Sequence, residues 1–162
     1  MTGQHPEDLD EQCGIMTKLF FSTLVRLRFS SVLERHAIKL TASQMTLLYA
    51  IYEAPERRLS AGRLAEELGV SAPAITGLAD KLHRDDFLTK LPGQEDRRVV
   101  ILALTESGKA AVEEMIDAFE ELFLPLLFEM SPDSRQSLLR GMEHIHALAR
   151  HITGQPVGVR SD

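Results

Sequence analysis

Cysteine and long apolar runs are scarce or missing in this sequence of 162 residues. The chain contains one cysteine, Cys13, so no disulfide can form within it. No apolar run is long enough to span a membrane, and residues 1–7 lack the basic and apolar segments of a secretion signal. We therefore expect a cytoplasmic protein without membrane contact.

The sequence also lacks the residue patterns of an enzyme. No paired nucleophile and base, no metal-ligand spacing and no glycine-rich phosphate loop is visible. His144, His146 and His151 follow one another at steps of two and five residues, whereas ligands on one face of a helix need steps of three or four. We predict that the chain is not an enzyme and holds neither a metal nor an organic cofactor.

An excess of positive charge is missing as well, since the net charge is −6. The acidic excess is local, because residues 101–150 contain nine acids and four bases, whereas residues 58–100 contain seven of each. Phosphate attraction acts within about 10 Å in salt solution, so a neutral segment can bind DNA through bases on one face. The candidates are Arg63, Lys81, Arg84, Lys90, Arg97 and Arg98. The alternative is that neighbouring acids pair with these bases and leave a balanced surface.

Apolar residues make up 44% of the chain, enough for one domain with a core, and two short helices are predicted in its middle. Ser60 is a good N-cap for the first, and Gly69 suits a left-handed residue at its end. Ser71 caps the second, and Pro73 falls in its first turn. The outer face of the second helix has only small or polar residues, namely Ser71, Pro73, Thr76, Gly77, Asp80 and Lys81. This pattern predicts a helix-turn-helix whose second helix enters a DNA major groove.

Two β-prone runs, residues 87–91 and 99–104, follow these helices and predict a hairpin. The polar turn between them ends in Arg97 and Arg98, and a hairpin placed after a helix-turn-helix forms a winged helix. Arginine suits the negative potential of a narrow minor groove. We expect Arg98 in the minor groove, its guanidinium braced by Asp96, and Arg97 at a phosphate.

Helices are predicted on both sides of the winged unit. The stretch from about Leu9 to Ala37 has two apolar stripes, so one is expected to rest on its own domain and the other on a partner subunit. Thr41 and Gln44 form a capping-box sequence that opens the next helix. Thr105 caps a long helix, which Pro125 is expected to kink or interrupt, and Pro132 starts the last one.

These elements predict a mainly α-helical fold with a small β-wing. Its parts are a disordered tail at 1–8, a winged helix-turn-helix DNA-binding domain at 41–104, helical dimerisation regions at 9–40 and 105–153, and a loose tail at 154–162. A two-fold dimer would present two recognition helices to successive major grooves, about 34 Å apart.

Several motifs carry a resemblance to a known family. They are Leu-Thr at 40–41, Leu-Ala-Glu-Glu-Leu-Gly-Val at 64–70, Asp-Lys-Leu at 80–82, Asp-Arg-Arg at 96–98 and Leu-Thr-Glu-Ser-Gly at 104–108. Over roughly residues 15–150 the chain resembles the MarR family of bacterial transcription regulators. It differs from the family at two positions: Gly77 stands where many relatives carry a basic base-contacting residue, and Asp86 replaces the glycine that usually ends the recognition helix.

The resemblance implies a homodimer that binds double-stranded DNA at a pseudo-palindromic operator, usually as a repressor released by a small lipophilic or aromatic-acid effector. The expected DNA-binding residues are Ser71, Pro73, Thr76, Gly77, Lys81, Asp96, Arg97 and Arg98. The resemblance also implies a ligand cleft between the dimerisation helices and the winged unit, whose candidate residues are Phe20, Arg26, Arg28, His36, Tyr49 and Tyr52. The aromatic residues would line the cleft, and a base would receive a carboxylate.

Two alternatives stay open at this point. A winged helix can also serve as a protein–protein interaction module, in which balanced charge matters and DNA does not. Some MarR relatives sense peroxides through a cysteine of the N-terminal helix, which makes Cys13 a candidate redox sensor. Its neighbours Glu11, Gln12 and Gly14 supply no cation to lower the thiol pKa, which favours an incidental cysteine.

Overall fold

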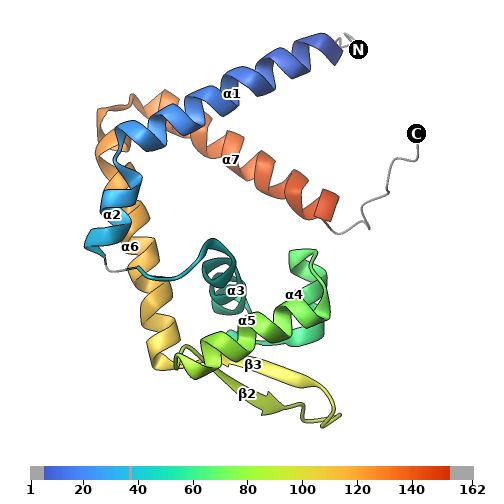
Figure 1. The fold of residues 1–162 in the computed structure, drawn as a ribbon. Helices are drawn as coiled ribbons and strands as arrows, with labels where there is room; N and C mark the ends of the chain where they lie inside the picture. Colours follow the sequence, from blue (N-terminus) through green and yellow to red (C-terminus); the bar gives the residue numbers. More distant parts are fainter. Residues whose placement is uncertain (1–5, 37, 154–162) are drawn as a thin grey trace.

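The structure is a computed structural model that describes residues 6–36 and 38–153. Figure 1 shows a winged unit at one end of the long helix α6 and two helical arms, α1 and α7, at the other. The helices are α1 (Pro6–Arg26), α2 (Phe29–Arg35), α3 (Ala42–Glu53), α4 (Ala61–Leu68), α5 (Ala72–Arg84), α6 (Glu106–Glu129) and α7 (Pro132–Thr153). The strands are β1 (Arg58–Ser60), β2 (Leu88–Pro92) and β3 (Val100–Leu104), and a short 3₁₀ turn, η1 (Pro55–Arg57), precedes β1. The predicted mainly helical fold with a β-wing is confirmed.

The winged unit has a three-stranded antiparallel sheet in the order β1-β3-β2. Leu59 of β1 pairs with Leu102 of β3, and Leu88 of β2 pairs with Leu104. Helices α3, α4 and α5 pack with this sheet around one core. Its fully buried side chains are Leu47, Leu48, Ile51, Leu64, Ile75, Leu82, Leu88, Leu102 and Val112. Because Val112 belongs to α6, the long helix closes the core of the winged unit.

The helix starts follow the predicted caps. The side chains of Thr41, Ser60, Ser71 and Thr105 each accept a hydrogen bond from the backbone N–H three residues ahead. Thr41 and Gln44 form the complete capping box, and Gly69 ends α4 at φ 63°. Each cap satisfies backbone donors that a helix leaves free in its first turn.

The end of α5 meets the start of α6 at a tight junction. Asp86 adopts φ 63°, so an aspartate occupies the left-handed position where a glycine would be usual. Its backbone carbonyl accepts a hydrogen bond of 2.6 Å from the Thr105 hydroxyl, and the Phe87 carbonyl accepts one of 3.2 Å from the Thr105 N–H. Gly108 lies so close that an added Cβ would stand 2.0 Å from the Phe87 oxygen. The start of α6 is thus fastened to the end of α5.

The N-terminal helices differ from the prediction in two ways. Residues Pro6–Asp8, expected in a disordered tail, form the first turn of α1, where proline is favoured because it needs no N–H partner. The single helix expected over 9–37 is broken at Arg28, which adopts φ 52° and ψ 45°. The break turns α2 onto α6, where Val32 packs with Ala118 and Leu122. The predicted tails at 1–5 and 154–162 lie outside the described residues.

The apolar residues of the two arms lie exposed within one chain. On α1, Leu19 is 61% exposed and Phe21 62%, so this part of the two stripes does not rest on its own domain. At and beyond the break, Leu27, Phe29 and Leu33 of the stripes do pack against the cluster that Val32 forms with α6. On α7, Met142 is 57% exposed. Helix α6 continues through Pro125 to Glu129, so of the expected kink or interruption, Pro125 does not cause the interruption. A missing proline N–H removes only one helical hydrogen bond, which a long helix tolerates at an exposed position.

Candidate functional site

The outer face of α5 is slim, polar and open. Ile75, Ala79 and Leu82 turn into the core, and the opposite side carries residues that are all exposed, namely Pro73, Thr76, Gly77, Lys81 and Arg84. Ser71 lies exposed at the N-terminal tip. A Cβ added at Gly77 would meet no atom within 4 Å, so nothing in the described chain covers this face. The helix can therefore approach a flat or grooved partner closely.

Arg84 is a further candidate contact residue on α5, and it was not among the contacts expected from the sequence. It follows Pro73 and Gly77 along the same face, because steps of four and seven residues return to one side of a helix. The helical spacing could have identified it, since it was already counted among the bases of the segment. It extends the exposed face of α5 toward its C-terminal end.

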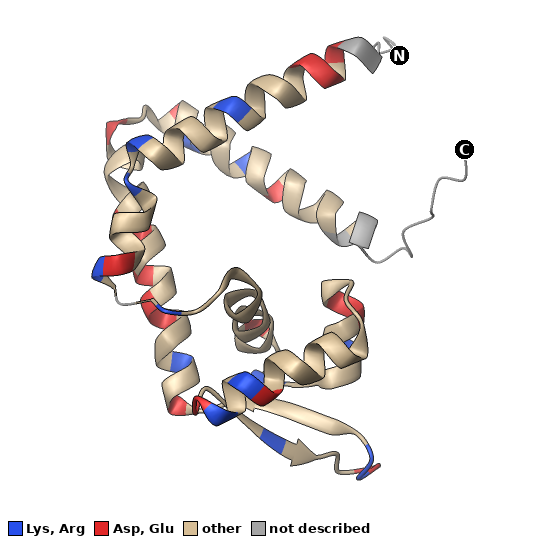
Figure 2. Ribbon diagram, in the orientation of Figure 1, with Lys and Arg blue, Asp and Glu red and all other residues tan. Residues whose placement is uncertain are grey.

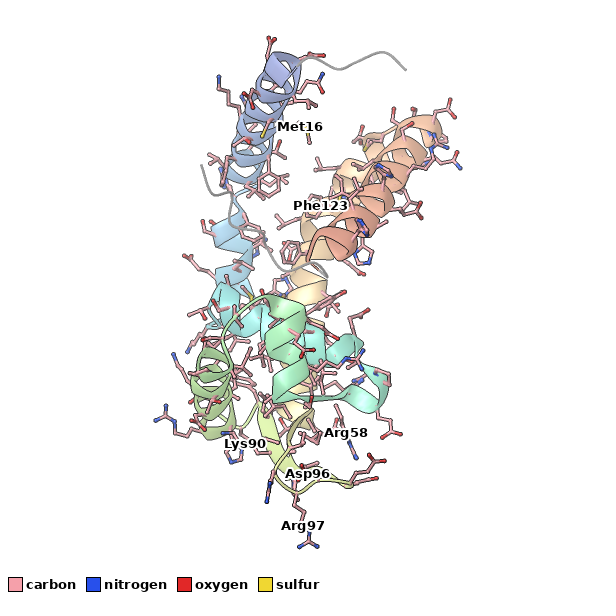
Figure 3. All side chains as sticks on the ribbon, turned by 90° about the vertical axis from the view of Figure 1, so that its right-hand side faces the viewer. Met16, Arg58, Lys90, Asp96, Arg97 and Phe123 are labelled. Carbon is pink, nitrogen blue, oxygen red and sulfur yellow. The ribbon has the colours of Figure 1, made fainter. Side chains whose placement is uncertain are left out.

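The wing loop places two arginines at the far end of the hairpin. Figure 3 shows Arg97 pointing away from the body of the molecule. The Asp96 carboxylate accepts a hydrogen bond of 2.9 Å from the backbone N–H of Arg98. The expectation that Asp96 braces the Arg98 guanidinium is therefore wrong, because an aspartate two residues ahead closes a local turn more readily than it reaches a long side chain. Asp96 shapes the loop and leaves both guanidinium groups free.

Two of the six candidate bases are neutralised by acids, as the balanced-surface alternative expected. Lys90 of β2 pairs with Asp80 of α5, and this pairing holds the pKa of the Asp80 carboxyl below its usual value. Arg63 Nε lies 3.0 Å from Glu67 Oε1. The remaining four have no ion pair with any residue that the structure describes, namely Lys81, Arg84, Arg97 and Arg98. Free positive charge thus remains on α5 and at the wing tip (Figure 2).

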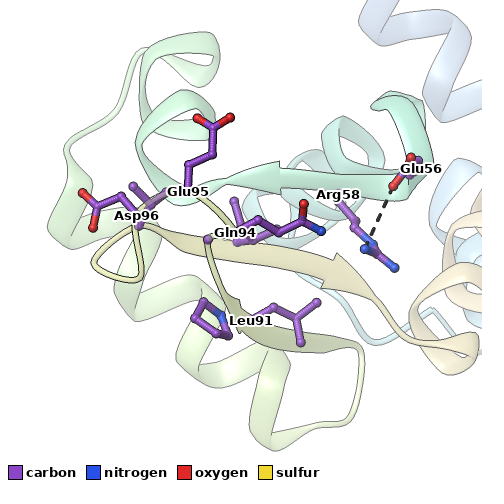
Figure 4. A pocket seen from close by; sticks show the side chains of 10 residues that line it. Glu56, Arg58, Leu91, Gln94, Glu95 and Asp96 are labelled. Atoms are coloured by element: carbon purple, nitrogen blue, oxygen red, sulfur yellow. Dashed lines mark ion pairs between the residues drawn. The ribbon is translucent and has the colours of Figure 1, made fainter.

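A hollow of about 520 Å³ lies beside the wing, between β1 and the loop (Figure 4). Leu91 and Ile101 form part of its wall, and acids surround it at Glu56, Glu95 and Asp96. Its one base, Arg58, lies 4.0 Å from Glu56. The acids make this hollow unsuited to phosphate.

A second groove, of about 670 Å³, lies where α3 meets α6. We call it the α3–α6 groove, and it is lined by Tyr49, Met115, Ile116, Phe119, Glu120, Phe123, Leu124 and Leu127. Its volume falls in the range of small-molecule sites, about 300–1,000 Å³. The ring of Tyr49 stacks on Tyr52 with centroids 6.4 Å apart, and the rings of Phe119 and Phe123 stack at 6.3 Å.

The predicted ligand-binding residues do not gather in one place. Tyr49 lines the α3–α6 groove and Tyr52 stacks behind it. Three others are not among its lining residues, namely Phe20, Arg26 and Arg28, which lie on α1 and at the break after it. Phe119, Glu120 and Phe123 of α6 were not predicted, because aromatic residues at helical spacing usually indicate only core.

His36 is not free to receive a ligand carboxylate, because two carboxylates of α6 already hold its ring. Its Nδ1 lies 2.5 Å from Glu114 Oε1 and its Nε2 lies 2.8 Å from Glu121 Oε2. Arg35 also pairs with Glu121. The bonds to Glu121 and then Glu114 raise the pKa of His36, and the bonds from His36 and then Arg35 lower the pKa of Glu121. The cluster fastens the end of α2 to α6.

The sequence predicted neither a metal site nor a membrane-spanning helix. Among residues 6–36 and 38–153, no three His, Cys, Asp or Glu side chains are grouped as a metal ion requires. In that same part of the chain, no helix combines the length and the apolar character needed to cross a bilayer. Cys13 is a free thiol exposed on α1.

Comparison with known proteins gives relatives of one kind. Residues 38–99 match the model of the MarR family. The chain is 30% identical over 135 residues to an uncharacterized HTH-type transcriptional regulator of Bacillus subtilis, YwaE, covering 82% of this chain and 75% of that protein. It is 35% identical over 77 residues to the HTH-type transcriptional repressor YetL of the same organism. That second match spans about half of each protein, 48% of this chain and 46% of YetL.

A solved structure agrees with the fold. Streptococcus pneumoniae FabT, crystallised in complex with DNA, superposes with a TM-score of 0.72 at 19% identity, covering 90% of this chain and 99% of that one. The two Bacillus subtilis relatives are transcriptional regulators rather than enzymes, as expected. The length and identity of the match to YwaE, together with the winged helix and the match to the family model, show that the chain belongs to the MarR family of DNA-binding transcriptional regulators.

Proposed function

We propose that this chain is a homodimeric, cytoplasmic repressor that binds a pseudo-palindromic DNA operator and releases it when a small lipophilic or aromatic-acid ligand binds. The observation that carries the proposal is the combination of an open α5 face with free arginines at the wing tip. Both lie at the end of the molecule opposite α1 and α7 (Figure 1). A major-groove helix and a minor-groove arginine need this arrangement.

The DNA-contacting residues take separate roles in this proposal. Thr76, Lys81 and the backbone-exposing Gly77 approach base edges and phosphates in the major groove, and Ser71 and Pro73 lie at the entering tip of α5. Because Gly77 has no side chain, Thr76 and Lys81 would contact the base edges, and the helix itself could lie closer to them. At the wing, Arg98 enters the minor groove, Arg97 contacts phosphate, and Asp96 fixes the loop that carries both arginines.

The dimer is built from the exposed apolar residues of α1 and α7. A two-fold partner would cover side chains that a monomer leaves in water, such as Leu19 and Phe21. The acidic residues gather on α6, which runs away from the α5 face and the wing tip toward the two arms (Figure 2). The ligand acts from the α3–α6 groove, whose walls join the DNA-reading unit to the dimerisation helix.

The test is a binding measurement on DNA. Duplexes that bind the purified chain are selected from a random-sequence pool, and the affinity for the selected site is then measured in a gel-shift titration at several salt concentrations. The logarithm of the binding constant should fall linearly with the logarithm of salt, by about 0.9 per phosphate contacted. An absence of selected sites and of salt dependence would instead indicate a protein-binding winged helix.

A further inference from the structure

The α3–α6 groove is acidic at its rim and contains no base. Its one charged lining residue is Glu120. Glu53, four residues after Tyr49 on α3, is not among the lining residues, but burial and then this carboxylate raise the pKa of Tyr49. Neither glutamate forms an ion pair with any residue in the described part of the chain. The carboxylate of Glu120 therefore lines an apolar, aromatic groove, and that of Glu53 acts on Tyr49 from outside the lining.

Two bases on segments next to the groove are engaged elsewhere. The Arg57 guanidinium carbon lies 4.4 Å from the ring centroid of Tyr52, and Arg57 does not line the groove. Lys109 Nζ lies 3.7 Å from Glu113, one turn of α6 before the groove. The carboxylate of an aromatic acid would thus lose water beside Glu120 without gaining a cationic partner, which is unfavourable.

The aromatic lining favours the opposite charge. Tyr49, Phe119 and Phe123 present rings around the groove, and the face of an aromatic ring attracts cations. Arg57 shows that this tyrosine pair already accepts a cation on the face of Tyr52. Aromatic faces combined with nearby carboxylates form the usual recognition site for organic ammonium ions.

We propose that the α3–α6 groove binds a lipophilic organic cation, held by its aromatic lining and by Glu53 and Glu120. This inference rests on the proposed function, because it concerns the same releasing ligand: of the lipophilic and aromatic-acid alternatives it selects a lipophilic ligand and names its charge as positive. The apolar floor, which includes Met115, Ile116 and Leu127, takes the hydrocarbon part of the ligand. The carboxylates select its charge.

The chain offers its own reporter for a test. It has no tryptophan and two tyrosines, Tyr49 and Tyr52, so the protein labelled with 3-fluorotyrosine gives two tyrosine resonances in fluorine NMR. Tyr49→Phe assigns them. Titration with tetraphenylphosphonium, a lipophilic cation, should shift the Tyr49 resonance saturably. Tetraphenylborate, an anion of nearly the same size and shape, should leave that resonance in place.

Charge variants show whether the carboxylates act directly. Glu120→Gln keeps the volume of the groove and should weaken tetraphenylphosphonium binding about two- to fivefold in calorimetry, the effect of one exposed charge pair. Adding Glu53→Gln should weaken it further. Glu129→Gln makes the same charge change at an exposed position of α6 outside the groove lining, so it should leave the affinity unchanged.

Three results would overturn the inference: tighter binding of tetraphenylborate, no shift of Tyr49 with the cation, or an equal loss in Glu129→Gln and Glu120→Gln. The second is expected if another copy of the chain covers the groove.

Gel-shift titration of the operator is a separate readout. A protein that binds no DNA contradicts the proposed function, whereas the NMR titration still decides which charge the groove accepts.

Discussion

Asp96 and Arg98 have different roles at the wing tip, although they are neighbours in one short loop. The Asp96 carboxylate bonds to the Arg98 backbone N–H, and the Asp96 carbonyl accepts a hydrogen bond of 3.0 Å from the N–H of Val99. A Cβ on Gly93 would stand 2.6 Å from that same carbonyl, so the loop is tightly closed. Asp96 determines the loop conformation, and Arg98 supplies the charge.

This division gives a prediction for three variants. Arg98→Ala should weaken operator binding roughly tenfold, because an arginine in the minor groove carries part of the binding free energy. Asp96→Ala should weaken it less, through a loosened loop, whereas Asp96→Asn keeps an acceptor oxygen and should bind as the parent does. Gel-shift titration measures all three. A loss in Asp96→Asn as large as in Asp96→Ala would indicate that charge, and not the turn, is what matters.

His36 gives a pH prediction at the α2–α6 contact. Its pKa is raised from the ordinary 6.5, chiefly by Glu121 and then by Glu114. A raised pKa means that the protonated ring stabilises the folded state fully below 6.5, and that this contribution is lost as the pH rises through the folded-state pKa. Glu121, whose pKa is lowered, loses its contribution only in acid.

The measurement is denaturant unfolding of the chain and of His36→Gln across a range from acidic to alkaline pH. The free energy of unfolding of the parent should decline on the alkaline side relative to the variant, since the variant has no imidazolium to deprotonate. Parallel curves for the two proteins would show that the His36 cluster does not stabilise the fold.

For single residues, the sequence predicted contacts between neighbours along the chain and did not predict contacts between distant residues. The caps of Thr41, Ser60, Ser71 and Thr105 were predicted because each partner lies three residues away. The partners of His36 lie 78 and 85 residues away, so nothing local marks them. The cleft and Tyr49 were expected, but the α6 side of the α3–α6 groove went unpredicted for the same reason, because Tyr49 and Glu120 meet only after folding.

At the scale of elements, the junction between the recognition helix and α6 leaves no space for a side chain. Gly108→Ala would place a Cβ against the Phe87 carbonyl, a backbone atom that cannot rotate away. We expect the substitution to destabilise the fold by about 1–3 kcal/mol, as overpacking usually does. Gly141→Ala is the matched control, because Gly141 lies in α7 with no atom within 4 Å of an added Cβ.

Both variants are measured by chemical denaturation. Gly141→Ala should be neutral or stabilising by up to about 1 kcal/mol, since alanine has the higher helix propensity. Equal effects of the two substitutions would mean that the contact at Gly108 relaxes without cost.

Element boundaries were predictable where turn residues mark them and not elsewhere. Gly69 ends α4 as expected, and the wing turn follows Pro92 and Gly93. The break between α1 and α2 falls at Arg28, where no glycine or proline signals it. It follows instead from Val32 packing on α6, a contact between distant segments. Pro125 is the converse case, because a strong local signal did not end the helix.

At the scale of the whole molecule, α1 contributes exposed apolar surface and little to the core of its own chain. Phe21→Asp should therefore leave the helical circular dichroism unchanged while shifting the dimer toward monomer in sedimentation. Operator binding should weaken with it, because one half-site replaces two. Phe21→Leu keeps the apolar surface and should remain dimeric. A dimer unaffected by Phe21→Asp would place the interface on another surface.

The tight fit at the start of α6 has a mechanical consequence for regulation. Asp86, Phe87, Thr105 and Gly108 join the reading helix and the long helix so closely that one cannot slide over the other. We therefore expect the winged unit and α6 to move together as one rigid body. In the proposed dimer, a small tilt of this rigid body would move the wing tip through a larger arc, so a ligand in the α3–α6 groove would change the spacing of the two α5 helices without deforming either winged unit.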